Sequence, residues 1–433
     1  MTKKIGIIHF TAPPIVGGVE STIYHHARML IEAGYQVKVI AGRGGDIYPG
    51  VEFQAIDEVD SSNPNILEAG KQLSQGIIGK EFIAPRDVLI NKLRITLNHI
   101  DVCIAHNVMT LHKNLPLTAA LHSLVSEGCP PLIAWSHDFA WQDNLYLPDL
   151  HPGYPWDLLR NPWEGVRYVV VSAHSRARLA QLLDLPESAI QVIHPGVEPA
   201  TFLKLAPLTQ EITNRLHLLE AEPLILLPAR ITRRKNIEFA IQVCAALKNS
   251  KPDVTLVVTG PPGPHNPTNI VYLQFLEQLI KDLGVADQVH FLYRQSQSDQ
   301  PLYLTDELVA DFFRLADLLF FPSQREGFGI PILEAGLARL PIFAADIPTF
   351  RESAGSLATF FDLDDDPDKV AAMIANHLQQ DTAYQLRHRI LRNYSWQSIL
   401  ETQLIPLIEE TCNVDRQATQ TFSNSDLKND EQI

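Results

Sequence analysis

Short apolar runs rich in valine, isoleucine and leucine alternate with longer amphipathic stretches along most of the chain. This alternation predicts buried parallel strands joined by crossover helices, which is the pattern of an α/β fold. In the first half we predict strands at residues 4–10, 36–41, 102–106, 132–136, 169–171 and 191–194. Helices are predicted between most of these strands, including residues 18–33 and 172–183.

The same alternation restarts after Gly196 and predicts a second sheet. Its strands are expected at residues 224–229, 255–260, 289–292, 318–321 and 341–344, and helical patterns follow at 366–378, 383–393 and 396–412. Between the two halves, the segment 194–197 with Pro199 and Pro207 after it reads as irregular, so we place a hinge there.

The pattern therefore predicts two doubly wound, Rossmann-like domains that face each other across an interdomain cleft. We expect the first domain over residues 1–197 and the second over 198–394. A helix at 395–412 is expected to pack back on the first domain, and the polar residues 413–433 are expected to form a disordered tail. Ligands of such sheets bind at the carboxyl ends of the strands, so the cleft is the expected site.

Composition supports this picture and excludes some functions. The chain has 433 residues, which suits two large domains, and 45% of them are hydrophobic against 20% charged, as in a folded globular protein. The formal net charge of −15 repels nucleic-acid phosphates, so no nucleic-acid partner is expected.

Cysteine usage and hydropathy bear on the compartment. The four cysteines form no CxxC pair, which fits a reducing cytoplasm. No run of about 18 apolar residues occurs, so we expect no transmembrane helix. We predict a cytoplasmic protein with at most peripheral contact with the inner face of the membrane.

The strongest local motif is the segment 322–335, PSQREGFGIPILEA, directly after the predicted strand 318–321. Its glycines permit a tight loop, and the N–H groups of Phe328, Gly329 and Ile330 would then form an anion cradle at the start of a helix. Glu326 and Glu334 could flank a bound diphosphate and accept hydrogen bonds from sugar hydroxyls. This combination suggests a sugar nucleotide; the alternative is a capped helix that carries a surface glutamate.

A basic cluster follows the predicted strand 224–229. Arg230, Arg233, Arg234 and Lys235 crowd one strand exit in an otherwise acidic protein. Arginine can grip phosphate oxygens through its fork, and lysine acts as a point charge, so Arg230 and Lys235 are candidate diphosphate ligands. Arg233 and Arg234 can equally be interpreted as solvated.

Two features of the first half add candidate site residues. His137 and Asp138 follow the predicted strand 132–136, where a histidine can accept a proton or orient a hydroxyl, and Asp138 can hold its tautomer or bind substrate. Gly17 and Gly18 follow the first strand and would let the backbone approach a ligand closely, although an ordinary strand-to-helix turn needs glycine too. A structural role is the alternative for each; His106, His194 and His265 are weaker candidates near strand ends.

No metal-binding pattern is evident. HExxH and paired Cys/His spacings are absent, and we interpret the acidic run 364–366 as a helix cap before Pro367.

Taken together, these residues resemble glycosyltransferase family 4, of the GT-B fold, over nearly the whole chain except the tail. Glu326 and Glu334, with seven residues between them, resemble the EX7E motif of that family. Arg230 and Lys235 resemble its diphosphate-binding pair, Gly17 and Gly18 its glycine loop, and His137 its active-site histidine. Ala229 and Asn236 depart from the family, which often has glycine at both positions.

The resemblance implies an acceptor-side first domain and a nucleotide-sugar-binding second domain. It implies retaining transfer of a hexose from a nucleotide-diphosphate sugar to an acceptor hydroxyl, by front-face attack. Glu326 would hold the sugar hydroxyls, Glu334 the ribose, and the amides of 328–330 the donor.

Further roles follow from the same resemblance. Arg230 and Lys235 would neutralise the leaving diphosphate, so no metal and no other cofactor are expected. His137 would hold the reacting sugar or the acceptor. Tyr293 and Arg294, after the strand 289–292, are guesses for the base pocket.

Donor and acceptor stay open at this stage. UDP-glucose is the first choice of donor and GDP-mannose the second; the acceptor is a sugar or a lipid-linked saccharide, as in exopolysaccharide or glycoconjugate synthesis, with small molecules as an alternative. A sugar-nucleotide 2-epimerase and a catalytically silent sugar-nucleotide-binding subunit are the competing functions.

Overall fold

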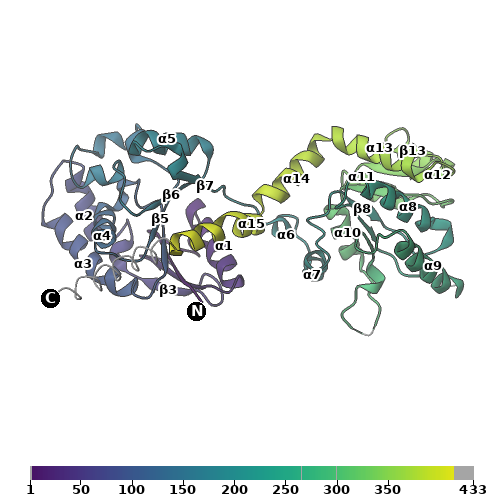
Figure 1. The fold of residues 1–433 in the computed structure, drawn as a ribbon, viewed down its shortest axis with the longest axis horizontal. Helices are drawn as coiled ribbons and strands as arrows, with labels where there is room; N and C mark the ends of the chain where they lie inside the picture. Colours follow the sequence, from purple (N-terminus) through teal and green to yellow (C-terminus); the bar gives the residue numbers. More distant parts are fainter. Residues whose placement is uncertain (1, 265, 299, 414–433) are drawn as a thin grey trace, which may run out of the picture. The chain divides into compact units, whose positions relative to one another are not determined.

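The computed structural model describes residues 2–264, 266–298 and 300–413. Its chain divides into two compact units (Figure 1). Unit 1 contains the residues up to Gly196 and those from Trp396 onward, and unit 2 runs from Val197 to Ser395.

Unit 1 is built on a parallel sheet of seven strands in the order β3-β2-β1-β4-β5-β6-β7. These strands are β1 (Lys4–Ile8), β2 (Gln36–Ala41), β3 (Glu52–Ala55), β4 (Val102–His106), β5 (Leu132–Ser136), β6 (Arg167–Val170) and β7 (Ile190–Val192). Successive side chains of a strand point to opposite faces, and both faces here are apolar. Ile133 and Trp135 of β5 pack on one face, for example, whereas Leu132 and Ala134 pack on the other.

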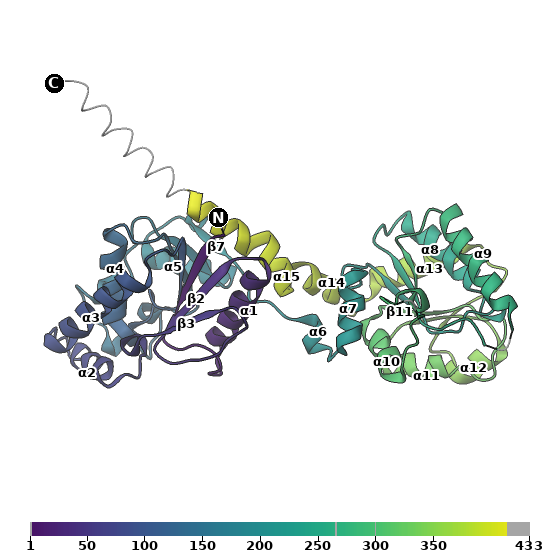
Figure 2. The same ribbon diagram turned by 90° about the horizontal axis from the view of Figure 1, so that it is seen from below.

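Helices cover both faces of this sheet. They are α1 (Gly18–Glu32), α2 (Pro64–Leu73), α3 (Lys80–Thr96), α4 (Leu115–Ser126), α5 (Ala173–Leu183) and α15 (Trp396–Ile399). Both views of the ribbon show α2, α3 and α4 grouped together in unit 1 (Figures 1 and 2). Residues of α3, α4 and α5 share one core cluster with the strands, and residues of α1 share the other.

The last described segment closes the α1 face of the sheet. Trp396, Ile399, Leu404 and Ile408 are buried in the same cluster as Ile5 and Ile7 of β1. A β-carbon on Gly196 would lie 2.6 Å from the Trp396 ring, so only glycine permits this close approach. The predicted helix 396–412 is not one regular α-helix, because Leu400–Leu404 form a π-helical turn between α15 and the helical residues 405–413.

Unit 2 is built on a parallel sheet of six strands in the order β10-β9-β8-β11-β12-β13. These strands are β8 (Leu224–Leu227), β9 (Thr255–Val258), β10 (Val289–Phe291), β11 (Leu318–Phe321), β12 (Ile342–Ala345) and β13 (Thr359–Phe361). Its helices are α6 (Pro199–Phe202), α7 (Pro207–Arg215), α8 (Ile237–Lys248), α9 (Thr268–Asp282), α10 (Asp306–Leu315), α11 (Ile330–Leu337), α12 (Pro348–Ala354), α13 (Pro367–Gln380) and α14 (Thr382–Tyr394). Figure 2 shows α8, α9 and α13 on one side of the sheet and α10, α11 and α12 on the other.

Three details of the predicted organisation were wrong. The sequence pattern missed β3 and β13, which are short strands at sheet edges. The segment after the predicted hinge is not irregular, since Pro199 and Pro207 begin helices α6 and α7. Asn413, placed in the predicted disordered tail, ends a helix, and the rest of that predicted tail, residues 414–433, lies outside the described residues.

Among the described residues, every helix is too short or too polar to cross a membrane.

Candidate functional site

The strand order of unit 2 reverses between β8 and β11. The chain leaves β8 toward β9 on one side, whereas it leaves β11 toward β12 on the other. The loops that follow these two strands therefore diverge at their carboxyl ends and leave a crevice, which is where ligands of open α/β sheets bind. The basic segment 230–235 lies in the first loop, and the glutamate-containing segment 322–329 lies in the second.

Side chains from the two loops meet directly. The Lys235 ammonium group pairs with Oε1 of Glu326, and Nη1 of Arg234 lies 3.2 Å from Oε2 of the same carboxylate. The backbone N–H of Gln324 also donates to the carbonyl of Arg234 at 2.9 Å. The structure thus brings together two residues that the sequence places 91 positions apart.

Burial gives this ion pair its electrostatic character. The side chains of Lys235 and Glu326 are each only 10% exposed. Burial lowers the pKa of Lys235, and the Glu326 carboxylate opposes that shift. Lys235 Nζ also lies 5.0 Å from the centre of the Phe321 ring, a cation–π contact that holds the ammonium group over the end of β11.

Asn236 ends the short 3-10 helix η7 (Arg233–Lys235) in the left-handed conformation, at φ 51° and ψ 48°. Glycine and asparagine adopt this conformation most readily. The asparagine therefore preserves the backbone turn that glycine would make at this position. Ala229, the other departure from the resembled family, has no positive φ and needs no glycine.

The second loop ends in a helix start with free donors. Gly329 has φ 91°, and a β-carbon there would lie 2.9 Å from the Phe350 ring, so both backbone and packing require glycine. Within the described part of the chain, the N–H groups of Gly327, Phe328 and Gly329 donate no hydrogen bond. They stand at the amino end of α11, where the helix dipole favours an anion.

The remaining predicted residues of unit 2 lie around this centre or away from it. Arg230 is exposed and makes no ion pair with any described residue. Glu334 lies on α11, where partial burial and Asp306 raise its pKa. Ile330 is 62% exposed. Tyr293 and Arg294 lie in a 3-10 turn after β10, an edge strand that β9 separates from β8; Arg294 pairs with Glu277 at 2.9 Å.

The corresponding reversal in unit 1 falls between β1 and β4. His9 follows β1 and its Nδ1 lies 2.6 Å from the carbonyl oxygen of His106 at the end of β4. His137 follows β5, the next strand along the sheet. Polar residues thus gather at the carboxyl edge of this sheet too.

Asn107 organises the loop that carries His137 and Asp138. Its Oδ1 accepts the backbone N–H groups of both residues, at 3.0 and 3.1 Å, and its Nδ2 donates to the Asp138 carboxylate at 2.9 Å. No hydrogen bond joins Asp138 to the His137 ring in the described structure, so Asp138 does not hold the tautomer of that ring. Burial lowers the pKa of His137, and its buried Nε2 has no partner among the described residues. This places a neutral imidazole with a free ring nitrogen beside the strand end.

The glycine loop is less constrained than the loop of unit 2. Gly17 is extended at φ −171° and caps α1, and no described atom lies within 4 Å of a β-carbon built on Gly18. Packing therefore does not demand glycine at 18. The space beside it is open, as expected where backbone must approach a ligand.

Other predicted features have structural roles. Asp366 caps α13 by accepting the N–H of Asp368, which confirms the interpretation of the acidic run. His194 Nδ1 bonds the carbonyl of Val171 at 3.0 Å, and His265 lies outside the described residues. No group of three His, Cys, Asp or Glu side chains in the described ranges is arranged to hold a metal ion.

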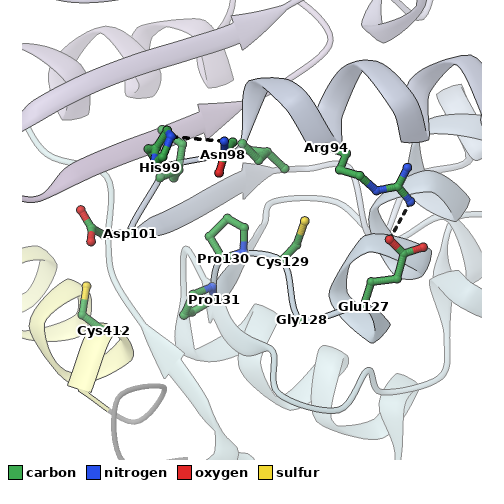
Figure 3. A pocket seen from close by; sticks show the side chains of 12 residues that line it. Arg94, Asn98, His99, Asp101, Glu127, Gly128, Cys129, Pro130, Pro131 and Cys412 are labelled. Atoms are coloured by element: carbon green, nitrogen blue, oxygen red, sulfur yellow. Dashed lines mark hydrogen bonds and ion pairs between the residues drawn. The ribbon is translucent and has the colours of Figure 1, made fainter. Parts of the chain in front are cut away.

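A pocket of about 490 Å³ lies at the opposite edge of the unit 1 sheet (Figure 3). It is lined by residues that precede β4 and β5, such as Asp101 and Pro131, and thus lies at the amino ends of the strands. Figure 3 shows Arg94 paired with Glu127, at 2.6 Å, so this arginine has its charge compensated. The pocket therefore lies away from the carboxyl ends of the strands, where ligands of such sheets bind.

Two functional candidates escaped the sequence interpretation. Arg234, for which a solvated position was left as an alternative, pairs with Glu326, and Asn107 was not among the predicted site residues. The position of Asn107 directly after a buried strand is a signal that could have identified it, because polar side chains at such ends are the ones that meet ligands.

Two family models match the chain. The model described as Glycosyltransferase Family 4 matches residues 16–201, and the model described as Glycosyl transferases group 1 matches residues 209–394. The chain belongs to glycosyltransferase family 4. With its two parallel Rossmann-like sheets, this family 4 glycosyltransferase has the GT-B fold and is an enzyme that transfers a sugar.

Curated relatives of this glycosyltransferase are distant. It is 23% identical over 380 residues to mannosylglucosylglycerate synthase of Petrotoga mobilis, covering 82% of this chain and 85% of the relative. It is 28% identical over 350 residues to D-inositol 3-phosphate glycosyltransferase of Salinispora arenicola, covering 76% and 72%.

Solved structures resemble the chain with lower sequence identity than these relatives. The glycosyltransferase WaaG, involved in lipopolysaccharide biosynthesis, is 18% identical with a TM-score of 0.33, over 95% of this chain and 99% of that one. Anabaena HepE in complex with UDP-glucose is 17% identical with a TM-score of 0.34, also over 95% and 99%. Because these sequence identities and TM-scores are low, the family is shown by the two family models.

Proposed function

We propose that this glycosyltransferase moves a hexose, with retention of anomeric configuration and without a metal ion, from a nucleotide-diphosphate sugar to an acceptor hydroxyl. The observation that carries the proposal is the buried Lys235–Glu326 pair, which joins the loops after β8 and β11 at the reversal of the sheet. Cations, unpaired N–H donors and a carboxylate at one strand edge are the groups that a diphosphate and a sugar need.

Each side chain of unit 2 has a role in this proposal. Lys235 and the unpaired Arg230 neutralise the charge that develops on the leaving diphosphate, which is the work a metal ion does in other transferases. The N–H groups of Gly327, Phe328 and Gly329 bind donor oxygens. Glu326, which is paired with Lys235 and Arg234, accepts hydrogen bonds from hydroxyls of the transferred sugar.

Residues outside this centre complete the proposal. Glu334 binds the ribose, and Tyr293 with Arg294 forms part of the base pocket. In unit 1, His137 binds a hydroxyl of the acceptor or of the reacting sugar, and the open space beside Gly18 leaves room for substrate. The pKa of His137 is lowered, so the ring is neutral at pH 7 and can accept a hydrogen bond.

UDP-glucose is the proposed donor, on the preference of the resembled family. GDP-mannose is the second candidate, and the mannosyl product named for the Petrotoga relative favours it. The acceptor is a sugar or lipid-linked saccharide in the cytoplasm. The name of the Salinispora relative, a D-inositol 3-phosphate glycosyltransferase, favours an acceptor that carries phosphate.

The test is nucleotide release from UDP-glucose and GDP-mannose in EDTA, with and without candidate saccharide acceptors, followed by NMR of the product. We expect slow hydrolysis without acceptor, faster turnover with it, and an anomeric configuration equal to that of the donor. Conversion of the donor alone to its 2-epimer would favour the epimerase, and absence of any turnover with intact binding would favour a silent subunit.

A further inference from the structure

Unit 1 contains a second polar pocket that none of the roles above uses. It is open, has a volume of about 510 Å³ and is lined by Trp141, Gln142, Arg160, Arg178, Gln181 and Leu182. Sites of this size accommodate small molecules. Arg178, Gln181 and Leu182 share one face of α5, next to the buried residues Leu179 and Leu183.

Arg178 is fixed in place without a carboxylate. Its Nε donates to Oε1 of Gln142 at 2.9 Å and its Nη2 to the Gln142 carbonyl at 3.4 Å, while Gln142 Nε2 donates back to the Arg178 carbonyl at 2.8 Å. The guanidinium also lies 5.2 Å from the centre of the Phe139 ring. No acidic side chain pairs with Arg178 among the described residues, so a preorganised positive charge faces the pocket.

Arg160 adds a second guanidinium from another segment. Its Cζ lies 4.1 Å from the centre of the Trp141 ring, a cation–π contact that holds the guanidinium group against this ring. Asp157 pairs with Arg160 at 2.8 Å and compensates its charge. Two arginines therefore line the pocket, and of these Arg160 is paired with a carboxylate, that of Asp157. The net charge of the whole protein is −15.

We infer that this pocket binds the anionic group, a phosphate or a carboxylate, of a sugar acceptor. Planar guanidinium groups match both oxyanions through paired N–H donors, and the amide of Gln181 supplies a further polar contact. The ligand class rests on the proposed transferase function, since the transferred sugar needs an acceptor; the anion preference itself rests only on the pocket.

The pocket belongs to the same loop as His137. Residues 137–142 are held on one side by Asn107, and by the carbonyl of Thr110, which accepts the N–H of Ala140 at 2.9 Å. On the other side they are held by Arg178 through Gln142. An acceptor anchored by its anionic group in this pocket would contact the same loop that carries His137.

The experiment is a calorimetric and tryptophan-fluorescence titration of the full chain with four probes: inorganic phosphate, glucose 6-phosphate, glucuronate and glucose. It is run with and without UDP, so that anion binding near Lys235 is recognised by competition. We expect saturable binding of glucose 6-phosphate or glucuronate in the presence of UDP, and much weaker binding of glucose. Phosphate against glucuronate decides which anion is preferred.

Variants locate the binding. Arg178→Gln and Arg160→Gln should each weaken the affinity at least about tenfold, as expected for loss of a charge-assisted hydrogen bond. Arg176→Gln is the matched control: it lies on the same helix but pairs with Glu187 at 2.9 Å, so it should leave the affinity unchanged. Thermal unfolding checks that each variant folds, and Arg160→Gln keeps the test valid if the loss of Arg178 loosens the loop.

The inference is overturned if no anionic probe binds while UDP does, if glucose binds as tightly as glucose 6-phosphate, or if Arg176→Gln weakens binding as much as Arg178→Gln. Loss of UDP binding with anion binding intact would contradict the proposed donor site and leave this pocket standing.

Discussion

At the residue scale, the candidate site depends on side-chain pairs that the linear sequence does not show. Lys235 and Glu326 were each predicted as ligand-binding residues, but their ion pair depends on β8 lying next to β11, which no local pattern states. The structure therefore adds the contact that makes the two loops one site. The roles of both residues stay predictions.

Removing either member of this pair should abolish most turnover. We expect Lys235→Ala and Glu326→Gln each to lower kcat/KM by about a hundred- to a thousandfold, the loss of roughly 2.7 to 4 kcal/mol of transition-state stabilisation. Lys235→Ala leaves Glu326 paired with Arg234, so the fold should persist. The measurement is steady-state kinetics, with Arg233→Gln as the control because Arg233 faces Tyr272 instead. Full turnover in both variants would contradict the site.

Asn236 offers a test of backbone geometry. Because its φ is 51°, Asn236→Gly should change the free energy of unfolding by less than about 0.5 kcal/mol, whereas Asn236→Val should cost about 1–2 kcal/mol. Urea unfolding measures both. Equal stability of the valine and glycine variants would show that the left-handed turn is not required.

At the element scale, a buried carboxylate ties α14 to the sheet of unit 2. Asp317, at the start of β11, accepts the backbone N–H of Leu224 at 2.8 Å and a ring nitrogen of His388 at 3.0 Å. Arg387 lies 3.6 Å away. Removing the Asp317 carboxylate would take this partner from the Leu224 N–H, the His388 ring and the Arg387 guanidinium at once. The carboxylate therefore has a structural role in unit 2.

Asp317→Ala should therefore destabilise unit 2 by about 3–5 kcal/mol, the cost of breaking a buried ion pair. Asp346→Ala is the exposed control; it pairs with Arg351 at 2.7 Å on the surface, where solvent screens the pair, so its loss should leave the stability nearly unchanged. Denaturant titrations compare the two. A similar small cost for both variants would exclude the structural role of Asp317.

Most strands were predictable, including the edge strands β7 and β10, whereas the short edge strands β3 and β13 were not. The strands at 36–41, 102–106, 132–136 and 318–321 have the predicted bounds because every neighbour in the sheet demands apolar residues there. β3 reads Glu-Phe-Gln-Ala and has partners on one side only, so its composition lacks that signature. The start of α11 could also be predicted from the sequence, because Gly329 and Pro331 mark it.

At the scale of the whole molecule, unit 1 contains a group of buried histidines whose pKa values are lowered. In unit 1, burial lowers the pKa of His9 to about 4 and that of His26 to about 3, and it places the pKa of His106 well below its usual range. His26 and His106 pack against the Trp135 ring, and their ring nitrogens find no partner among the described residues. These histidines were not predicted to cluster, because β1, β4 and α1 bring them together only in the fold.

Acid should therefore destabilise unit 1. The unfolded chain binds protons at these histidines near pH 6.5, whereas the folded unit does not until about pH 4 or below, so stability is lost as pH falls through this window. Each such histidine contributes about 1.4 kcal/mol per pH unit. Calorimetry between pH 7.5 and 4.5 should show the unfolding temperature of unit 1 falling, and His26→Leu should reduce that slope. A slope unchanged by the substitution would contradict the assignment.

The central claim is that the loops after β8 and β11 bind a nucleotide-diphosphate sugar without a metal ion. Its most direct test is calorimetric titration of the wild-type chain and of Lys235→Ala with UDP, UDP-glucose, GDP and GDP-mannose in EDTA. We predict micromolar binding of one nucleotide family, one molecule per chain, weakened at least about tenfold in the variant. Absence of binding by all four ligands, or equal affinity of the variant, would contradict the claim.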